Sequence, residues 1–119
     1  MYQLAAEHGY AKAQYNLGVM YQQGQGATSD NKAAIKWYQL AAEQGHAIAQ
    51  NNLGFMYGRG LGVPKSLIYA FMWWDIAASK GNKDAIFGRD QVLKTLSPSQ
   101  LEEAKALVRQ CMEQNYKNC

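Results

Sequence analysis

The chain has 119 residues, of which 48% are hydrophobic and 18% charged, and its formal net charge is +3. This composition is ordinary for a globular protein and excludes an intrinsically disordered chain. Lys and Arg are scattered rather than clustered, no apolar run is long enough to cross a bilayer, and no signal peptide is recognisable. Neither nucleic-acid binding nor a transmembrane helix is therefore predicted.

A 36-residue internal repeat organises the chain. Residues 9–44 align with residues 45–80 without a gap, and 15 of the 36 positions are identical. Self-similarity of this kind is typical of solenoids, in which each unit packs only against its neighbours. We interpret 9–44 and 45–80 as complete repeats, 81–95 as the first helix of a divergent terminal repeat, and 96–119 as a C-terminal capping helix and tail.

Residues 1–8 are predicted to be the second helix of a truncated repeat, because the sequence of Tyr2–Glu7 recurs at Tyr38–Glu43. Two interpretations of this start remain open. Either a leader and earlier repeats precede it in a longer protein, or a second copy covers the apolar face around Leu4 and Ala5 and forms a homodimer.

Each complete repeat is predicted to hold two helices. The first, residues 11–21 in the first unit, has apolar or small residues at helical spacing. A glycine-bearing loop follows, and the second helix begins after Asp30 or Ser66, which are residue types that cap a helix N-terminus. Gly9, Gly45 and Gly81 fall just past each second helix, where a left-handed residue ends a helix at little cost.

Large aromatic residues alternate with small residues in the predicted core. Ala13, Gly18 and Ala34 allow the helices to approach closely, whereas Trp37 and Trp73 fill the space between them. Replacing either tryptophan with alanine is expected to cost about 3–5 kcal/mol of stability.

The C-terminal segment begins with a strong helix-start signal. Ser97–Gln100 combines an N-cap serine, a proline at the first helical position and a glutamine that completes a capping box. Cys111 and Cys119 lie close enough in sequence to form a bridge that would contribute about 2.5 kcal/mol and hold the tail. Two cysteines at one end favour an exported, oxidising location; the alternative is two free thiols in a cytoplasmic protein.

The motif A-x-A-Q-x-N-L-G-x-M-Y, then G-x-G, then A-x-x-W-Y-x-x-A-A-x-x-G, resembles the Sel-1-like repeats of bacterial proteins, which are relatives of the tetratricopeptide repeats. The resemblance covers residues 1 to about 88. It implies an all-α fold, an α/α superhelix (solenoid) of helix-turn-helix repeats, and a function as an adaptor between proteins. With the cysteines, it favours the bacterial periplasm or secretion over the cytoplasm. The second unit departs from the first at Leu67, Tyr69 and Trp74, which predicts a more deeply buried second helix.

Comparison of the two repeats suggests a binding face. The positions of the first helices that differ between units are spaced by three or four residues, so they share one helical face. In stacked helical hairpins this face lines the concave groove, where we expect a partner protein or peptide to bind. The predicted groove comprises Lys12, Tyr15, Asn16, Val19, Gln22, Gln23, Ile48, Asn51, Asn52, Phe55, Arg59, Phe87 and Gln91.

Two of these assignments have explicit alternatives. The variable face could be an ordinary solvated surface. Asn16 and Asn52 recur in both units, and we favour a role in tying neighbouring repeats together over one in holding a peptide backbone, as an asparagine does in related tetratricopeptide units. Tyr15 and Phe55 are expected to be exposed aromatics of the kind that dominate protein interfaces.

No catalytic, metal or cofactor site is predicted. His8 and His46 stand at successive repeat junctions without a metal-ligand pattern, and neither a phosphate-binding lysine motif nor a nucleophile motif is present. We therefore expect a protein that is not an enzyme. The alternatives are a cell-envelope protein that binds or processes peptidoglycan-like ligands, as in β-lactamase-like relatives, and a structural homo-oligomer.

Overall fold

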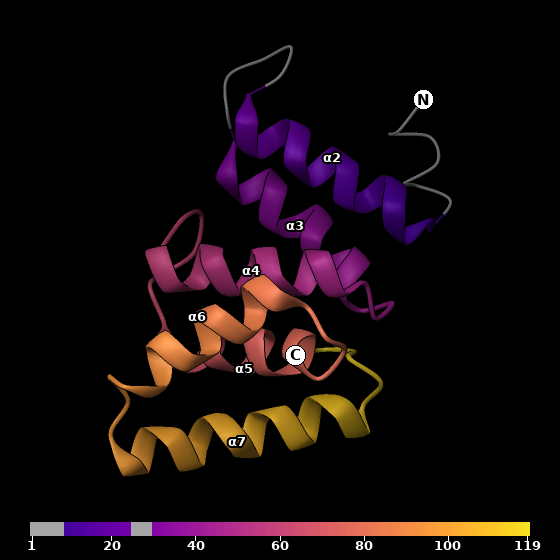
Figure 1. Cartoon of the computed structure of the whole chain (residues 1–119). Helices are drawn as coiled ribbons and strands as arrows, with labels where there is room; N and C mark the ends of the chain where they lie inside the picture. Colours follow the sequence, from indigo (N-terminus) through magenta and orange to yellow (C-terminus); the bar gives the residue numbers. More distant parts are fainter. Residues whose placement is uncertain (1–8, 25–29) are drawn as a thin grey trace.

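Successive helical hairpins stack side by side into a solenoid (Figure 1). The computed structural model describes residues 9–24 and 30–119, so the predicted helix at residues 1–8 and the surface around Leu4 and Ala5 lie outside the described residues. The described part contains six α-helices and no strand, and the all-α solenoid is confirmed. The helices are α2 (Ala11–Gln23), α3 (Asn31–Ala42), α4 (Ala47–Arg59), α5 (Leu67–Ala78), α6 (Lys83–Leu93) and α7 (Pro98–Glu113).

Side-chain caps begin the helices where the sequence predicts them. The Asp30 carboxylate accepts a hydrogen bond from the amide of Ala33 at 3.0 Å. The Ser66 hydroxyl accepts one from Tyr69 at 3.1 Å. Ser97 forms the complete capping box at the start of α7. These bonds satisfy backbone donors that have no partner inside the helix.

The junctions between units repeat the same geometry. Gly9, Gly45 and Gly81 have φ angles of +87°, +84° and +87°, which confirms the predicted left-handed positions. The carbonyl of Gly9 accepts a 2.6 Å hydrogen bond from the Gln44 side chain, and the carbonyl of Gly45 accepts one of 2.6 Å from the Lys80 ammonium group. Because Gln44 and Lys80 occupy equivalent repeat positions, the same hydrogen bond links the last residue of each unit to its first.

In each complete hairpin, an aromatic ring of the second helix packs against a glycine of the first helix and fixes the spacing between the two helices. A Cβ atom on Gly18 would lie 2.6 Å from the Tyr38 ring, and one on Gly54 would lie 2.5 Å from the Trp74 indole. Only glycine leaves room for these rings, which explains why it recurs at this position. The indole N–H of Trp74 donates a 3.1 Å hydrogen bond to the backbone carbonyl of Asn51, which orients the ring.

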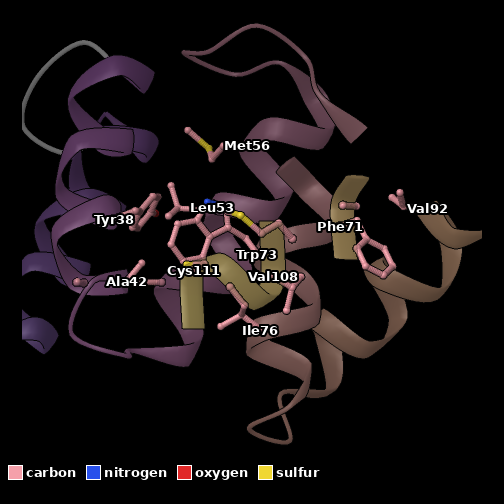
Figure 2. Packing of buried hydrophobic residues seen from close by; sticks show 14 of the residues in the cluster. Tyr38, Ala42, Leu53, Met56, Phe71, Trp73, Ile76, Val92, Val108 and Cys111 are labelled. Atoms are coloured by element: carbon pink, nitrogen blue, oxygen red, sulfur yellow. The ribbon is translucent and has the colours of Figure 1, made fainter. Parts of the chain in front are cut away.

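Trp73 lies at the centre of the main core. Its side chain is 0% exposed, and Figure 2 shows the indole between Tyr38 of the first unit and Cys111 of α7. Trp37 is only partly buried, against Ala13 and Leu17. Both tryptophans contact core residues as predicted, but they differ in burial, and the stability cost of replacing each stays a prediction.

The C-terminal helix covers the last hairpin. It packs along α5, the more apolar second helix, in which seven residues are buried. Cys111 is buried and forms a disulfide with Cys119, with the Cα atoms 5.4 Å apart. The tail between them places Tyr116 beneath Lys80, whose nitrogen lies 4.3 Å from the ring centroid. The tail is thereby attached to the junction at which Lys80 holds Gly45.

Candidate functional site

A groove with a volume of about 590 Å³ opens between α4 and α6, which are the first helices of successive hairpins. Trp74 of α5 forms its floor, and the exposed rings of Phe55 and Phe87 stand on opposite walls. Cavities of this size accommodate several side chains of a ligand.

The groove gathers part of the predicted binding face. Phe55 is 38% exposed and Phe87 is 67% exposed, so both rings are accessible to a ligand. The predicted residues that line the groove are Gln22, Asn51, Asn52, Phe55, Arg59, Phe87 and Gln91.

The remaining predicted residues lie outside this groove: Lys12, Tyr15, Asn16, Val19, Gln23 and Ile48. The expectation that Tyr15 is an exposed aromatic is wrong. Its ring stacks on His46 with centroids 5.1 Å apart and lies 5.9 Å from the ring of Tyr38. Val19 is likewise packed against the core. At the junction of α2 with α4 these side chains fill the space between the helices, whereas the equivalent space between α4 and α6 is open.

Several groove residues were missed by the comparison of the two complete repeats: Gly58, Leu67, Trp74, Asp84, Gly88 and Val92. Extending the 36-residue offset into the third unit would have found part of this set, because Asp84 and Gly88 correspond to Ile48 and Asn52. The overall match fades in that unit, so the sequence predicts only Phe87 and Gln91 there.

Hydrogen bonds and burial fix the edge of the groove nearest the first unit. The Tyr38 hydroxyl donates a 2.6 Å hydrogen bond to the side-chain carbonyl of Gln22. Burial raises the pKa of Tyr38 to about 12, although its hydrogen bond with the Asn52 side chain acts in the opposite direction. Asn52 thus contacts the preceding unit and also borders the groove.

Opposite charges mark the two ends of the groove. Because α4 and α6 run side by side in the same direction, Arg59 in the last turn of α4 and Asp84 in the first turn of α6 lie toward opposite ends. The Arg59 guanidinium carbon lies 5.0 Å from the centroid of the Phe55 ring, a cation–π arrangement that holds it at the rim.

No group of three His, Cys, Asp or Glu side chains in 9–24 and 30–119 could hold a metal ion. In the same part of the chain, no helix is long and apolar enough to cross a membrane.

The sequence model of the Sel1 repeat family matches residues 11–46 and 47–82. The chain belongs to the Sel1 repeat family. The matched units have the 36-residue length of the predicted repeat. Proteins of this family are generally non-catalytic scaffolds for protein interactions.

Solved structures of similar proteins share the fold. The protective antigen c5321 of uropathogenic Escherichia coli, which displays an SLR fold, is 35% identical with a TM-score of 0.91. The match covers 97% of this chain but 26% of the antigen, so the chain spans about a quarter of its length. A Sel1 repeat protein from Oxalobacter formigenes is 38% identical with a TM-score of 0.73, over 76% of this chain and 68% of that protein. No curated protein matches the chain.

Proposed function

We propose that this Sel1 repeat chain is an interaction module that binds an extended segment of a partner protein in the groove between α4 and α6. The observation that carries the proposal is the mixture of exposed rings and amide side chains along one groove of about 590 Å³. Pockets that bind specific ligands combine an apolar lining with a few placed polar groups in this way.

The polar groups suit a peptide backbone. Asn51, Asn52 and Gln91 line the groove, and their primary amides can both donate and accept hydrogen bonds. An extended segment presents N–H and C=O groups at regular intervals, and these need partners once the segment is removed from water. The amides can supply such partners without requiring a particular partner sequence.

The apolar groups provide anchoring positions. Phe55 and Phe87 are exposed whereas Trp74, the other ring that lines the groove, is partly buried, and the two phenylalanines come from different helices. Aromatic residues at the centre of an interface contribute a large share of the binding free energy. A segment lying between the two rings would contact α4 of one unit and α6 of the next, so the site depends on the stacking of successive hairpins.

The proposal can be tested by selecting peptides from a random displayed library on the wild-type protein and measuring their affinity by fluorescence anisotropy. Phe87→Glu should weaken binding at least about tenfold, since the ring is replaced by a solvated charge. Leu93→Glu is the matched control, because Leu93 lies on the same helix, is 42% exposed and does not line the groove.

Selected peptides that bind the Phe87→Glu and Leu93→Glu variants with equal affinity would place the interaction elsewhere on the molecule. Circular dichroism of both variants shows whether each remains helical.

A further inference from the structure

We infer that the groove floor is a receptor for one aromatic side chain of the bound segment. This inference rests on the proposed function and specifies its ligand. It comes from comparing two junctions that lie at equivalent positions of the repeat but have different side chains, the junction of α2 with α4 and that of α4 with α6.

The first junction is filled by the protein itself. Tyr15 stacks on His46 and lies beside Tyr38, with centroid distances of 5.1 and 5.9 Å. Gln22 and Asn52 complete the filling, since both hydrogen-bond to the Tyr38 side chain. At the first junction a tyrosine ring therefore occupies this place.

The second junction lacks all three filling side chains. Asn51 stands at the position of Tyr15, Gly58 at that of Gln22, and Gly88 at that of Asn52. All three line the groove. The vacant volume thus corresponds to the place of the Tyr15 ring and of the Gln22 amide, whereas the Trp74 indole packs against Gly88 and takes up the place of the Asn52 side chain.

The residues that surround this vacant volume of the groove are aromatic. Trp74 replaces Tyr38 on the floor, and its indole rests against Gly54 and Gly88, on which a Cβ would lie 2.5 and 2.6 Å from the ring. Phe55 and Phe87 replace smaller residues of the first junction, Val19 and Asn51, and stand at the rim. A guest ring entering here meets aromatic surfaces on several sides, an arrangement that favours an aromatic over an aliphatic side chain.

The charged residues at the ends of the groove indicate which residue of the ligand should stand beside its aromatic side chain. In residues 9–24 and 30–119, no carboxylate forms an ion pair with Arg59. An acidic residue of the bound segment, placed toward the C-terminal end of α4, would complement this guanidinium group. The proposed ligand is therefore an extended peptide with a tyrosine, phenylalanine or tryptophan and an acidic residue beside it.

The test uses blocked pentapeptides of the form Gly-Gly-X-Glu-Gly, with X as Tyr, Trp or Leu, titrated into the ¹⁵N-labelled protein. The indole Nε1–H signal of Trp74 reports directly on the groove floor. We expect the Tyr and Trp peptides to shift this signal and to bind about fivefold more tightly than the Leu peptide. Replacing Glu with Gln in the Tyr peptide should weaken binding about twofold to threefold.

Two variants refill the groove with residues that the first junction accommodates. Asn51→Tyr restores the tyrosine, and Gly58→Gln restores the glutamine. Each should abolish the response to the Tyr peptide, and Leu93→Tyr, which adds a ring on α6 outside the groove, should retain it. Gly58→Gln keeps the test decisive if Asn51→Tyr does not fold, which circular dichroism will show.

Equal affinity for the Leu and Tyr peptides, with Trp74 shifted by both, would overturn the aromatic inference and leave peptide binding in the groove intact. Retained binding of the Tyr peptide by the refilled variants would also overturn it. No shift at Trp74 with any of the three peptides would contradict the aromatic receptor, whereas the library selection with Phe87→Glu tests the proposed function separately.

Discussion

The two tryptophans at equivalent repeat positions are predicted to contribute unequally to stability. The Trp73 side chain is 0% exposed and contacts both the first unit and α7, so Trp73→Ala removes a full complement of contacts and leaves a cavity. We expect a loss of about 4 kcal/mol. Trp37 is partly buried against Ala13 and Leu17, and water can refill part of its space, so Trp37→Ala should cost about 2 kcal/mol.

Urea denaturation followed by circular dichroism at 222 nm measures both losses, and thermal unfolding provides an independent check. At about 4 °C per kcal/mol for a chain of this size, the midpoint should fall by about 16 °C for Trp73→Ala and about 8 °C for Trp37→Ala. Equal losses would refute the reasoning, because they would mean that the difference in burial between Trp73 and Trp37 does not determine how much each contributes to stability. Coincident transitions by fluorescence and circular dichroism are needed, since repeat arrays can unfold in stages.

Three further predictions concern the scaffold. Cys111→Ser with Cys119→Ser should lower the free energy of unfolding by about 2.5 kcal/mol, and the reductant dithiothreitol should lower the wild-type midpoint but not that of the variant. His46 caps α4 by accepting a hydrogen bond from the amide of Ala49, and burial, with a smaller effect of a nearby lysine, lowers its pKa. Stability should therefore fall as pH drops below about 6.5, and His46→Asn should remove this dependence in denaturation curves at pH 5 and 7.5. Gly54→Ala should cost about 1–2 kcal/mol in urea denaturation despite the better helix propensity of alanine, because its methyl group would collide with the Trp74 ring; unchanged stability would contradict this.

The scaffold could be predicted from the sequence because its determinants are local or repeated. Asp30 and Ser66 cap helices through amides three residues away, and Gly45 ends its helix through its own backbone conformation. Such features depend on a few neighbouring residues in the chain. They recur at a 36-residue offset wherever the packing recurs, which is why comparing two units revealed them.

The site was harder to predict because it depends on contacts between units. Tyr15 and Asn51 occupy the same repeat position, yet the first is packed in the junction and the second lines an open groove. Variation between repeats marks positions that are free to differ, but it does not distinguish a side chain that fills a junction from one that borders a cavity. Making that distinction requires knowing which residue the following unit supplies to the junction. This residue is Asn52 at the first junction and Gly88 at the second.

The same repeat thus carries two different junctions in one chain. The contact between a glycine of the first helix and an aromatic ring of the second, and the hydrogen bond to the junction glycine, are common to both complete units and lie within each unit. A side chain that borders the next unit, such as Tyr15 or Asn51, can therefore differ between units without removing these contacts. An array of similar units can in this way carry a distinct groove at one place, and the residues at positions 51, 58 and 88 determine what that groove can accept.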